Sequence, residues 1–146
     1  MSGVIDTNLL LYSINRDAVE YNAARSFLEK VATSADSYYL TEGILYEFLR
    51  VSTHHRVFAF PLSAQEAWSF LKGVLYFPSI EILGVTKNHW KILEGEIGQE
   101  AGIRGNLFFD ARTYIQMKEQ GIKRIYTMDH DFKRFSDIEV VNPLSP

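Results

Sequence analysis

The sequence contains no cysteine, which excludes a disulfide framework, a cysteine nucleophile and thiolate metal ligands. Long apolar runs are also missing. The stretch NLLLYSI at residues 8–14 is too short for a signal peptide or a membrane span, and no basic segment precedes it. Basic charge is not in excess, because 15 Lys and Arg face 18 Asp and Glu, a net charge of −3. We therefore expect a cytoplasmic protein without membrane association, and the charge counts mildly against a non-specific nucleic-acid binder.

The residues that are present are typical of one globular domain. The chain has 146 residues, of which 47% are hydrophobic and 23% charged, enough to build one sizeable core. No repeat, low-complexity segment or linker interrupts it, so we predict a single domain over residues 1–146.

Apolar periodicity and turn signals predict alternating strands and helices. Strands are expected at 3–6, 37–40, 79–85, 123–128 and 138–142, and helices at 18–32, 42–55, 61–75, 87–101 and 106–121. Thr41, the Ser63–Glu66 capping box and Gly121 mark helix ends. This alternation predicts an α/β fold with a mainly parallel sheet covered on both faces.

Two aspartates fall at the ends of predicted strands. Asp6 ends the first apolar strand, and Asp129 follows the strand KRIYTM. Ligands bind beyond the carboxyl ends of the strands in open parallel sheets. If the two strands are neighbours, both carboxylates therefore emerge on the same rim.

Two further acids border apolar helix faces. Glu47 lies about 40° around its helix from Val51, at the edge of the apolar arc. Asp110 shares a helix face with Tyr114 and Met117 and lies near the helix start, where the macrodipole favours an anion. Both side chains are therefore expected at the border of the core.

Converging carboxylates repel one another and are costly to bury, and a divalent cation resolves both problems. Oxygen ligands without Cys suit Mg²⁺, with Mn²⁺ as the alternative, better than Zn²⁺. Taken singly, each acid also has an ordinary interpretation. Asp6 can be a turn former or an N-cap, Asp110 a first-turn acid and Glu47 a rim residue, while Asp129 and Asp131 can cap a short helix.

The segments VIDTNLLLY, YEFLRV, GNLFFDA, TMDHDFKRF and VVNPL occur in this order. The ordered set, from Gly3 to Leu144, resembles the PIN-domain family and most closely the VapC-type toxins of bacterial toxin–antitoxin systems. The resemblance implies a three-layer α/β/α sandwich and metal-dependent endonucleolytic cleavage of RNA. It implies that the catalytic and metal-binding acids are Asp6, Glu47, Asp110 and Asp129, and that Asn8, Asn106, Thr127 and Asp131 support them.

The resemblance also implies a homodimer and a VapB-type antitoxin whose C-terminal segment covers the acidic groove. Arg50, Arg112 and Arg134 flank the acidic motifs and are our candidate RNA contacts. Glu47 is preferred to Glu42 as the helix acid because Phe48-Leu49-Arg50-Val51 follows it. The roles of Glu42, His130 and Asp131 stay open.

The sequence argues against some rival functions and leaves others open. A haloacid-dehalogenase phosphatase needs an Asp where Asn8 stands, and no Gly-rich phosphate loop of an NTPase exists. The remaining alternatives are a non-catalytic metal-binding module that contacts RNA or protein, and a DNA-acting PIN-like nuclease. Loss of metal-dependent cleavage in an Asp110→Ala variant would separate the enzyme from the binding module.

Overall fold

The computed structural model describes residues 1–99 and 102–145. Within these ranges a single sheet of five parallel strands runs in the order β3-β2-β1-β4-β5. The strands are β1 (Gly3–Ile5), β2 (Tyr38–Thr41), β3 (Ile80–Leu83), β4 (Arg124–Tyr126) and β5 (Glu139–Val141). Val4 in β1 pairs with Tyr39 on one side and Ile125 on the other, which makes β1 the central strand.

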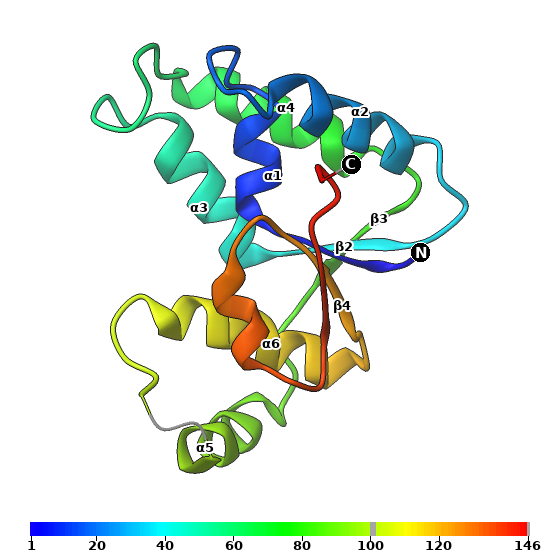
Figure 1. The fold of residues 1–146 in the computed structure, drawn as a ribbon, viewed down its shortest axis with the longest axis vertical. Coiled ribbons are helices and arrows are strands. Elements are labelled where there is room, and N and C mark those ends of the chain that lie inside the picture. The colour runs from blue at the N-terminus through cyan, green and yellow to red at the C-terminus, as the bar shows by residue number, and fades with distance from the viewer. Residues whose placement is uncertain (100–101, 146) are drawn as a thin grey trace.

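Six α-helices and one 3-10 helix are present in the described ranges. They are α1 (Thr7–Tyr12), α2 (Tyr21–Ala32), α3 (Glu42–Ser52), α4 (Ala64–Leu75), α5 (His89–Gln99), α6 (Leu107–Gln120) and η1 (His130–Arg134). Figure 1 shows α1 to α4 on one side of the sheet and α5 and α6 on the other. The fold is therefore a three-layer α/β/α sandwich, which confirms the fold class predicted from the sequence.

The core lies on both faces of the central strand β1. β1 is buried along its whole length, as expected for a central strand with helices on both faces. Helix side chains complete the core, and Phe48 of α3 and Leu71 of α4 are fully buried. No helix within the described ranges is long and apolar enough to cross a membrane.

Most helix ends follow the sequence signals. The Thr41 hydroxyl accepts a hydrogen bond from the Ile44 amide at 3.1 Å, and Ser63 and Glu66 form the reciprocal capping box. Gly121 ends α6 with φ of 70°, a left-handed conformation that glycine adopts without strain. The predicted helix over 87–101 corresponds to α5, and its last two positions lie outside the described residues.

One helix was not predicted. α1 has six residues and follows β1 directly, with Asp6 at its N-cap. Leu9 and Leu10 of this helix are buried in the core. Such a short helix contains fewer than two turns, too few for apolar periodicity to reveal it.

The strand order predicts a ligand-binding crevice between the ends of β1 and β4. From β1 the chain builds outward through β2 and β3, then returns across the sheet to β4 on the other side of β1. The order therefore reverses between β1 and β4, and ligands bind at the carboxyl ends of the strands beside such a switch point. Asp6 and Thr127 are the residues that directly follow these two strands.

Candidate active site

Asp6 is fixed by both strands that flank the switch point. Its amide donates to the carbonyl oxygen of Tyr126 in β4 at 3.0 Å. Its carboxylate accepts hydrogen bonds from the Thr7 amide at 2.8 Å and the Thr127 hydroxyl at 2.7 Å. Burial raises the pKa of Asp6 to about 6, although these two hydrogen bonds oppose the rise.

Asn8 and Thr127 join the ends of β1 and β4. The Asn8 amide nitrogen donates to the Thr127 hydroxyl at 3.1 Å, and its oxygen accepts from the Met128 amide at 3.3 Å. The Thr127 oxygen also accepts from the Asp129 amide at 2.9 Å. One hydroxyl thus donates to Asp6 and accepts from two other groups, which uses its full hydrogen-bonding capacity.

A second set of carboxylates faces Asp6 from α6 and η1. Among the described residues, Asp110, Asp129 and Asp131 each offer a carboxylate oxygen, and these oxygens lie within 4.8 Å of one another. The Asp131 amide donates to Asp129 at 2.8 Å, so Asp129 also caps η1. The capping interpretations of Asp6 and Asp129 are therefore correct. Asp129 also belongs to this acidic cluster, and its charge acts on Asp6 beside it.

The acids interact electrostatically. Burial is the main cause that raises the pKa of Asp110 to about 7, and the negative charges of Asp129, Asp6, Asp131 and Glu47 contribute to this rise in decreasing order. Asp110 lies in the first turn of α6, as predicted, and this position favours its ionised form. Burial together with this repulsion therefore outweighs the helix dipole.

Glu47 reaches the cluster from α3. The hydroxyl of Thr7, a residue only 2% exposed, donates to the Glu47 carboxylate at 3.1 Å. Glu47 itself is exposed, so it lies further from the core than its place at the edge of the apolar arc predicted. Local sequence patterns do not predict this contact of Thr7, because the only signal for Thr7 is its position next to Asp6.

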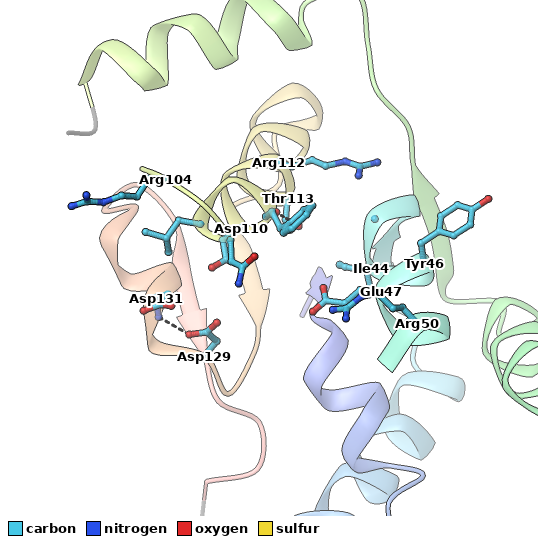
Figure 2. A pocket seen from close by; sticks show the side chains of 14 residues that line it. Ile44, Tyr46, Glu47, Arg50, Arg104, Asp110, Arg112, Thr113, Asp129 and Asp131 are labelled. Carbon is cyan, nitrogen blue, oxygen red and sulfur yellow. Dashed lines mark hydrogen bonds between the residues drawn. The ribbon is translucent and has the colours of Figure 1, made fainter. Parts of the chain in front are cut away.

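These side chains border an open pocket of about 660 Å³ between α3 and the start of α6. Figure 2 shows Asp110 between Glu47 on one side and Asp129 and Asp131 on the other. Asp6 is not one of the lining residues; it lies at the strand end and is linked to the cluster through Thr127 and Asp129.

The other candidate residues differ in whether they line the pocket. Arg50, Arg112 and Asn106 line the pocket, whereas Arg134 and His130 do not. Arg112 pairs with Glu42 at 3.1 Å, which gives Glu42 a partner other than the acidic cluster. Arg104, which is not one of the candidate RNA contacts predicted above, also lines the pocket. Its loop conformation could not be read from local patterns.

The donor set fits a hard divalent cation. All of the clustered groups offer oxygen, and no histidine belongs to the cluster found among the described residues. Oxygens around one Mg²⁺ at 2.0–2.1 Å lie within about 4.2 Å of each other. The carboxylate oxygens of Asp110, Asp129 and Asp131 lie within 4.8 Å of one another, so small side-chain adjustments would let them share one ion. A cation would also remove the repulsion that raises the pKa values of Asp6 and Asp110.

The sequence is similar to a known protein family and to several of its members. Residues 3–138 match the family model of the PIN domain. The chain is 26% identical to ribonuclease VapC48 of Mycobacterium tuberculosis over 145 residues, which cover 99% of each protein. It is 29% identical to ribonuclease VapC43 of the same species over 140 residues, 96% of this chain and 94% of that one.

Two solved structures share the fold. VapC20 of M. tuberculosis, a toxin that cleaves the sarcin–ricin loop, superimposes with a TM-score of 0.68 at 15% identity and covers 96% of this chain and 98% of its own. The VapBC2 complex of Rickettsia felis, bound to a DNA fragment from its promoter, gives 0.65 at 20% identity, covering 97% and 98%. Since the family model spans nearly the whole sequence, the chain belongs to the PIN-domain family.

Proposed function

We propose that this protein is a VapC-type endoribonuclease, the toxin of a VapBC-type pair, and that it hydrolyses RNA with a divalent cation held by its acidic residues. The observation that carries the proposal is the cluster of Asp110, Asp129 and Asp131, whose carboxylate oxygens lie within 4.8 Å of one another beside the strand-terminal Asp6. Membership of the PIN-domain family and relatives named ribonucleases support it.

The four proposed ligands are Asp6, Glu47, Asp110 and Asp129, with Mg²⁺ as the ion and Mn²⁺ as the alternative. Such an ion would lower the pKa of a bound water and neutralise charge that develops on the phosphate. Hydrogen bonds within the protein orient two of the proposed ligands. Thr127 orients the Asp6 carboxylate, and Thr7 orients both Asp6 through its amide and Glu47 through its hydroxyl.

The proposed reaction is hydrolysis. A water oxygen forms a bond to phosphorus, the bond from phosphorus to the 3′ oxygen breaks, and that oxygen takes a proton. The products are a 5′-phosphate and a 3′-hydroxyl. Arg50 and Arg104 line the same pocket as Asp110 and would bind neighbouring phosphates of the substrate.

The proposal includes protein partners in the cytoplasm. We expect a VapB-type antitoxin, because the similar R. felis structure is a VapBC complex. The homodimer implied by the family resemblance remains part of the proposal. An antitoxin arginine that entered the pocket could form charge-assisted hydrogen bonds with the carboxylates. It would then compete with the cation and switch cleavage off.

The test is cleavage of a cellular RNA pool by purified protein free of antitoxin, with EDTA, Mg²⁺ or Mn²⁺, followed by mapping of the cut ends. We expect discrete cuts that need the metal and carry 5′-phosphates. Asp110→Ala should abolish them. Asp17→Ala, which removes an exposed acid outside the pocket, is the matched control and should cut normally.

Three outcomes would contradict the proposal, provided that thermal melting shows folded protein. RNA binding without cleavage at any metal concentration would indicate a non-catalytic binding module. Preferential cleavage of DNA would indicate a DNA-acting nuclease. Cuts that persist in Asp110→Ala would place the chemistry elsewhere or in a contaminant.

A further inference from the structure

Tyr114 joins the two elements that carry the clustered acids. It lies on α6, one helical turn after Asp110 and on the same face of the helix. Its hydroxyl donates to the Asp137 carboxylate at 2.5 Å, and its ring stacks on Phe135 with ring centroids 4.0 Å apart. Tyr114 and Phe135 are each only 3% exposed. These contacts between Tyr114, Phe135 and Asp137, which we call the clasp, connect α6 to the segment that follows η1.

The 3-10 helix η1 is held at both of its ends. Before η1, the Thr127 hydroxyl accepts a hydrogen bond from the Asp129 amide at 2.9 Å. Within η1, Phe132 is 1% exposed and packs in the core. Phe135 is the C-cap of η1, so the clasp fixes this end of the helix against α6. The position of η1 relative to α6 therefore depends on the clasp.

The clustered acids repel one another across the space between α6 and η1. The negative charges of Asp129 and Asp131 act on Asp110, and Figure 2 shows the three side chains next to one another. Along the chain, α6 is connected to η1 through β4, which starts beyond the opposite end of α6. The clasp lies one helical turn from Asp110 and therefore opposes this repulsion close to where it acts.

We propose that Tyr114 is a positioning residue that sets the size of the ion accepted by the acidic cluster, because it holds η1 close enough to α6 for Mg²⁺ to be preferred to Ca²⁺. This inference rests on the proposed function and adds a determinant of metal selectivity. Oxygens on opposite sides of Mg²⁺ lie about 4.2 Å apart, whereas around Ca²⁺ they lie up to about 5.2 Å apart in a more flexible geometry. The limit of 4.8 Å in the cluster falls between these values, so a small change in spacing changes which ion fits.

A role of Tyr114 in core packing alone makes a different prediction. A residue that only stabilises the core lowers the melting temperature when it is changed, and it weakens the binding of every ion alike through partial unfolding. A residue that sets the spacing of the acids changes the ratio of two ion affinities in protein that is still folded.

The test measures the Kd of the protein, free of antitoxin, for Mg²⁺ and for Ca²⁺ by displacement of Mn²⁺ followed with EPR. Tyr114→Phe removes the hydroxyl but keeps the ring, Asp137→Ala removes the acceptor, and Asp137→Asn restores an acceptor oxygen. His89→Ala is the matched control, because buried His89 of α5 contacts Glu119 of α6 at 2.8 Å, away from η1. Thermal melting would show that each variant is folded.

We expect Tyr114→Phe and Asp137→Ala to raise the Kd for Mg²⁺ about tenfold and to leave the Kd for Ca²⁺ nearly unchanged. Asp137→Asn should bind both ions like the wild type, because the asparagine oxygen accepts the same hydrogen bond. His89→Ala should lower Tm without changing the ratio of the two Kd values.

An unchanged ratio of the two Kd values in Tyr114→Phe and Asp137→Ala would overturn the inference, and so would the same change of ratio in His89→Ala. If Asp137→Asn does not restore the ratio, the hydrogen bond is not the cause, which also overturns it. Failure of the nuclease assignment has a separate signature, because the wild type would then prefer Mg²⁺ with this dependence on Tyr114 and yet cut no RNA.

Discussion

The exposed side of the pocket and the strand ends beside it are built differently. The floor, which we define as Asp6, Asn8, Thr127 and Asp129, lies at the strand ends and reaches the pocket lining through Asp129. It is wholly or partly buried, and hydrogen bonds of 2.7–3.4 Å connect its members. The wall, defined as Tyr46, Arg50, Arg104 and Phe109, is exposed. The floor is therefore fixed by folding, whereas the wall keeps rotamer freedom until something binds.

The rigid floor and the adaptable wall suit different tasks. Ligands of a small cation must hold their geometry closely, and supporting hydrogen bonds provide that precision. Contacts to a long flexible substrate gain from adaptable side chains, each of which contributes modestly. Changes to the floor should therefore cost far more activity than changes to the wall.

The largest effect is expected from Asp6→Asn. Asparagine keeps the shape and the N-cap of α1 but removes a charge and one of two acceptor oxygens. We expect single-turnover RNA cleavage to fall by about 100-fold or more, the cost typical of losing one electrostatic contact in an active site. Near wild-type cleavage at saturating Mg²⁺ would refute the role of Asp6.

Thr127→Val tests the hydrogen bonds of the floor without touching a proposed ligand. Valine keeps the volume but removes the hydroxyl that binds Asp6, Asn8 and Asp129. The expected result is a 10–100-fold loss of metal affinity, measured by Mn²⁺ titration with EPR. Thr127→Ser should restore the affinity, and if it does not, the hydroxyl is not the cause.

The raised pKa values predict how pH affects the metal-free protein. The ordinary pKa of an aspartate is 3.8, and Asp6 and Asp110 take up protons at about 6 and about 7 in the folded state. The folded state therefore binds more protons than the unfolded state between pH 4 and 7. Their contribution to the free energy of unfolding falls as pH rises through this window and is constant above it.

Asp110→Asn removes the titrating group and isolates its share. Because solvent screens this half-buried carboxyl, we expect a gain on the order of 1 kcal/mol, or about 2–4 °C in Tm, at pH 8 in EDTA. At pH 4 the gain should vanish. Thermal melts across pH would measure it, and wild-type and variant curves of the same shape would contradict the assignment.

Arg104→Ala should have a smaller effect. The loss of one phosphate contact should weaken RNA binding a few-fold and reduce the salt dependence of binding by about one counterion. Arg134→Ala is the matched control, since that exposed arginine does not line the pocket. Equal effects of the two substitutions would remove the distinction between the wall and the remaining surface.

The smallest effect should follow Glu42→Gln. Glu42 holds Arg112 in a solvent-exposed ion pair at 3.1 Å, and such pairs contribute about 0.2–1 kcal/mol. Release of Arg112 toward the pocket should improve RNA affinity about twofold. A loss of affinity would show that the pair positions Arg112 for binding.

The sequence predicts the fold well where signals are local. Caps and alternating apolar segments predict five strands and five of the helices, and the strand order explains why two strand-terminal acids meet. The helix α1 has no such signal, because Leu9 and Leu10 alone do not define a helical period. Its existence depends on tertiary packing against the core.

The arrangement of the acids is predicted less completely. The positions of Asp6 and Asp129 follow from strand ends, which are local features, and that of Asp110 from its helix face, whereas their catalytic roles stay predictions. The contact between Thr7 and Glu47 joins residues 40 positions apart, which no local pattern reveals. The position of Arg104 in the pocket depends on a loop, where sequence patterns carry little information.

Anomalous diffraction from crystals of the protein soaked in Mn²⁺ would locate the ion directly. We expect an anomalous peak bounded by the carboxylates of Asp110 and Asp129, and its loss in Asp110→Asn. A Mn²⁺ peak elsewhere in a protein that cleaves RNA, or cleavage with no peak at this cluster, would contradict this expectation.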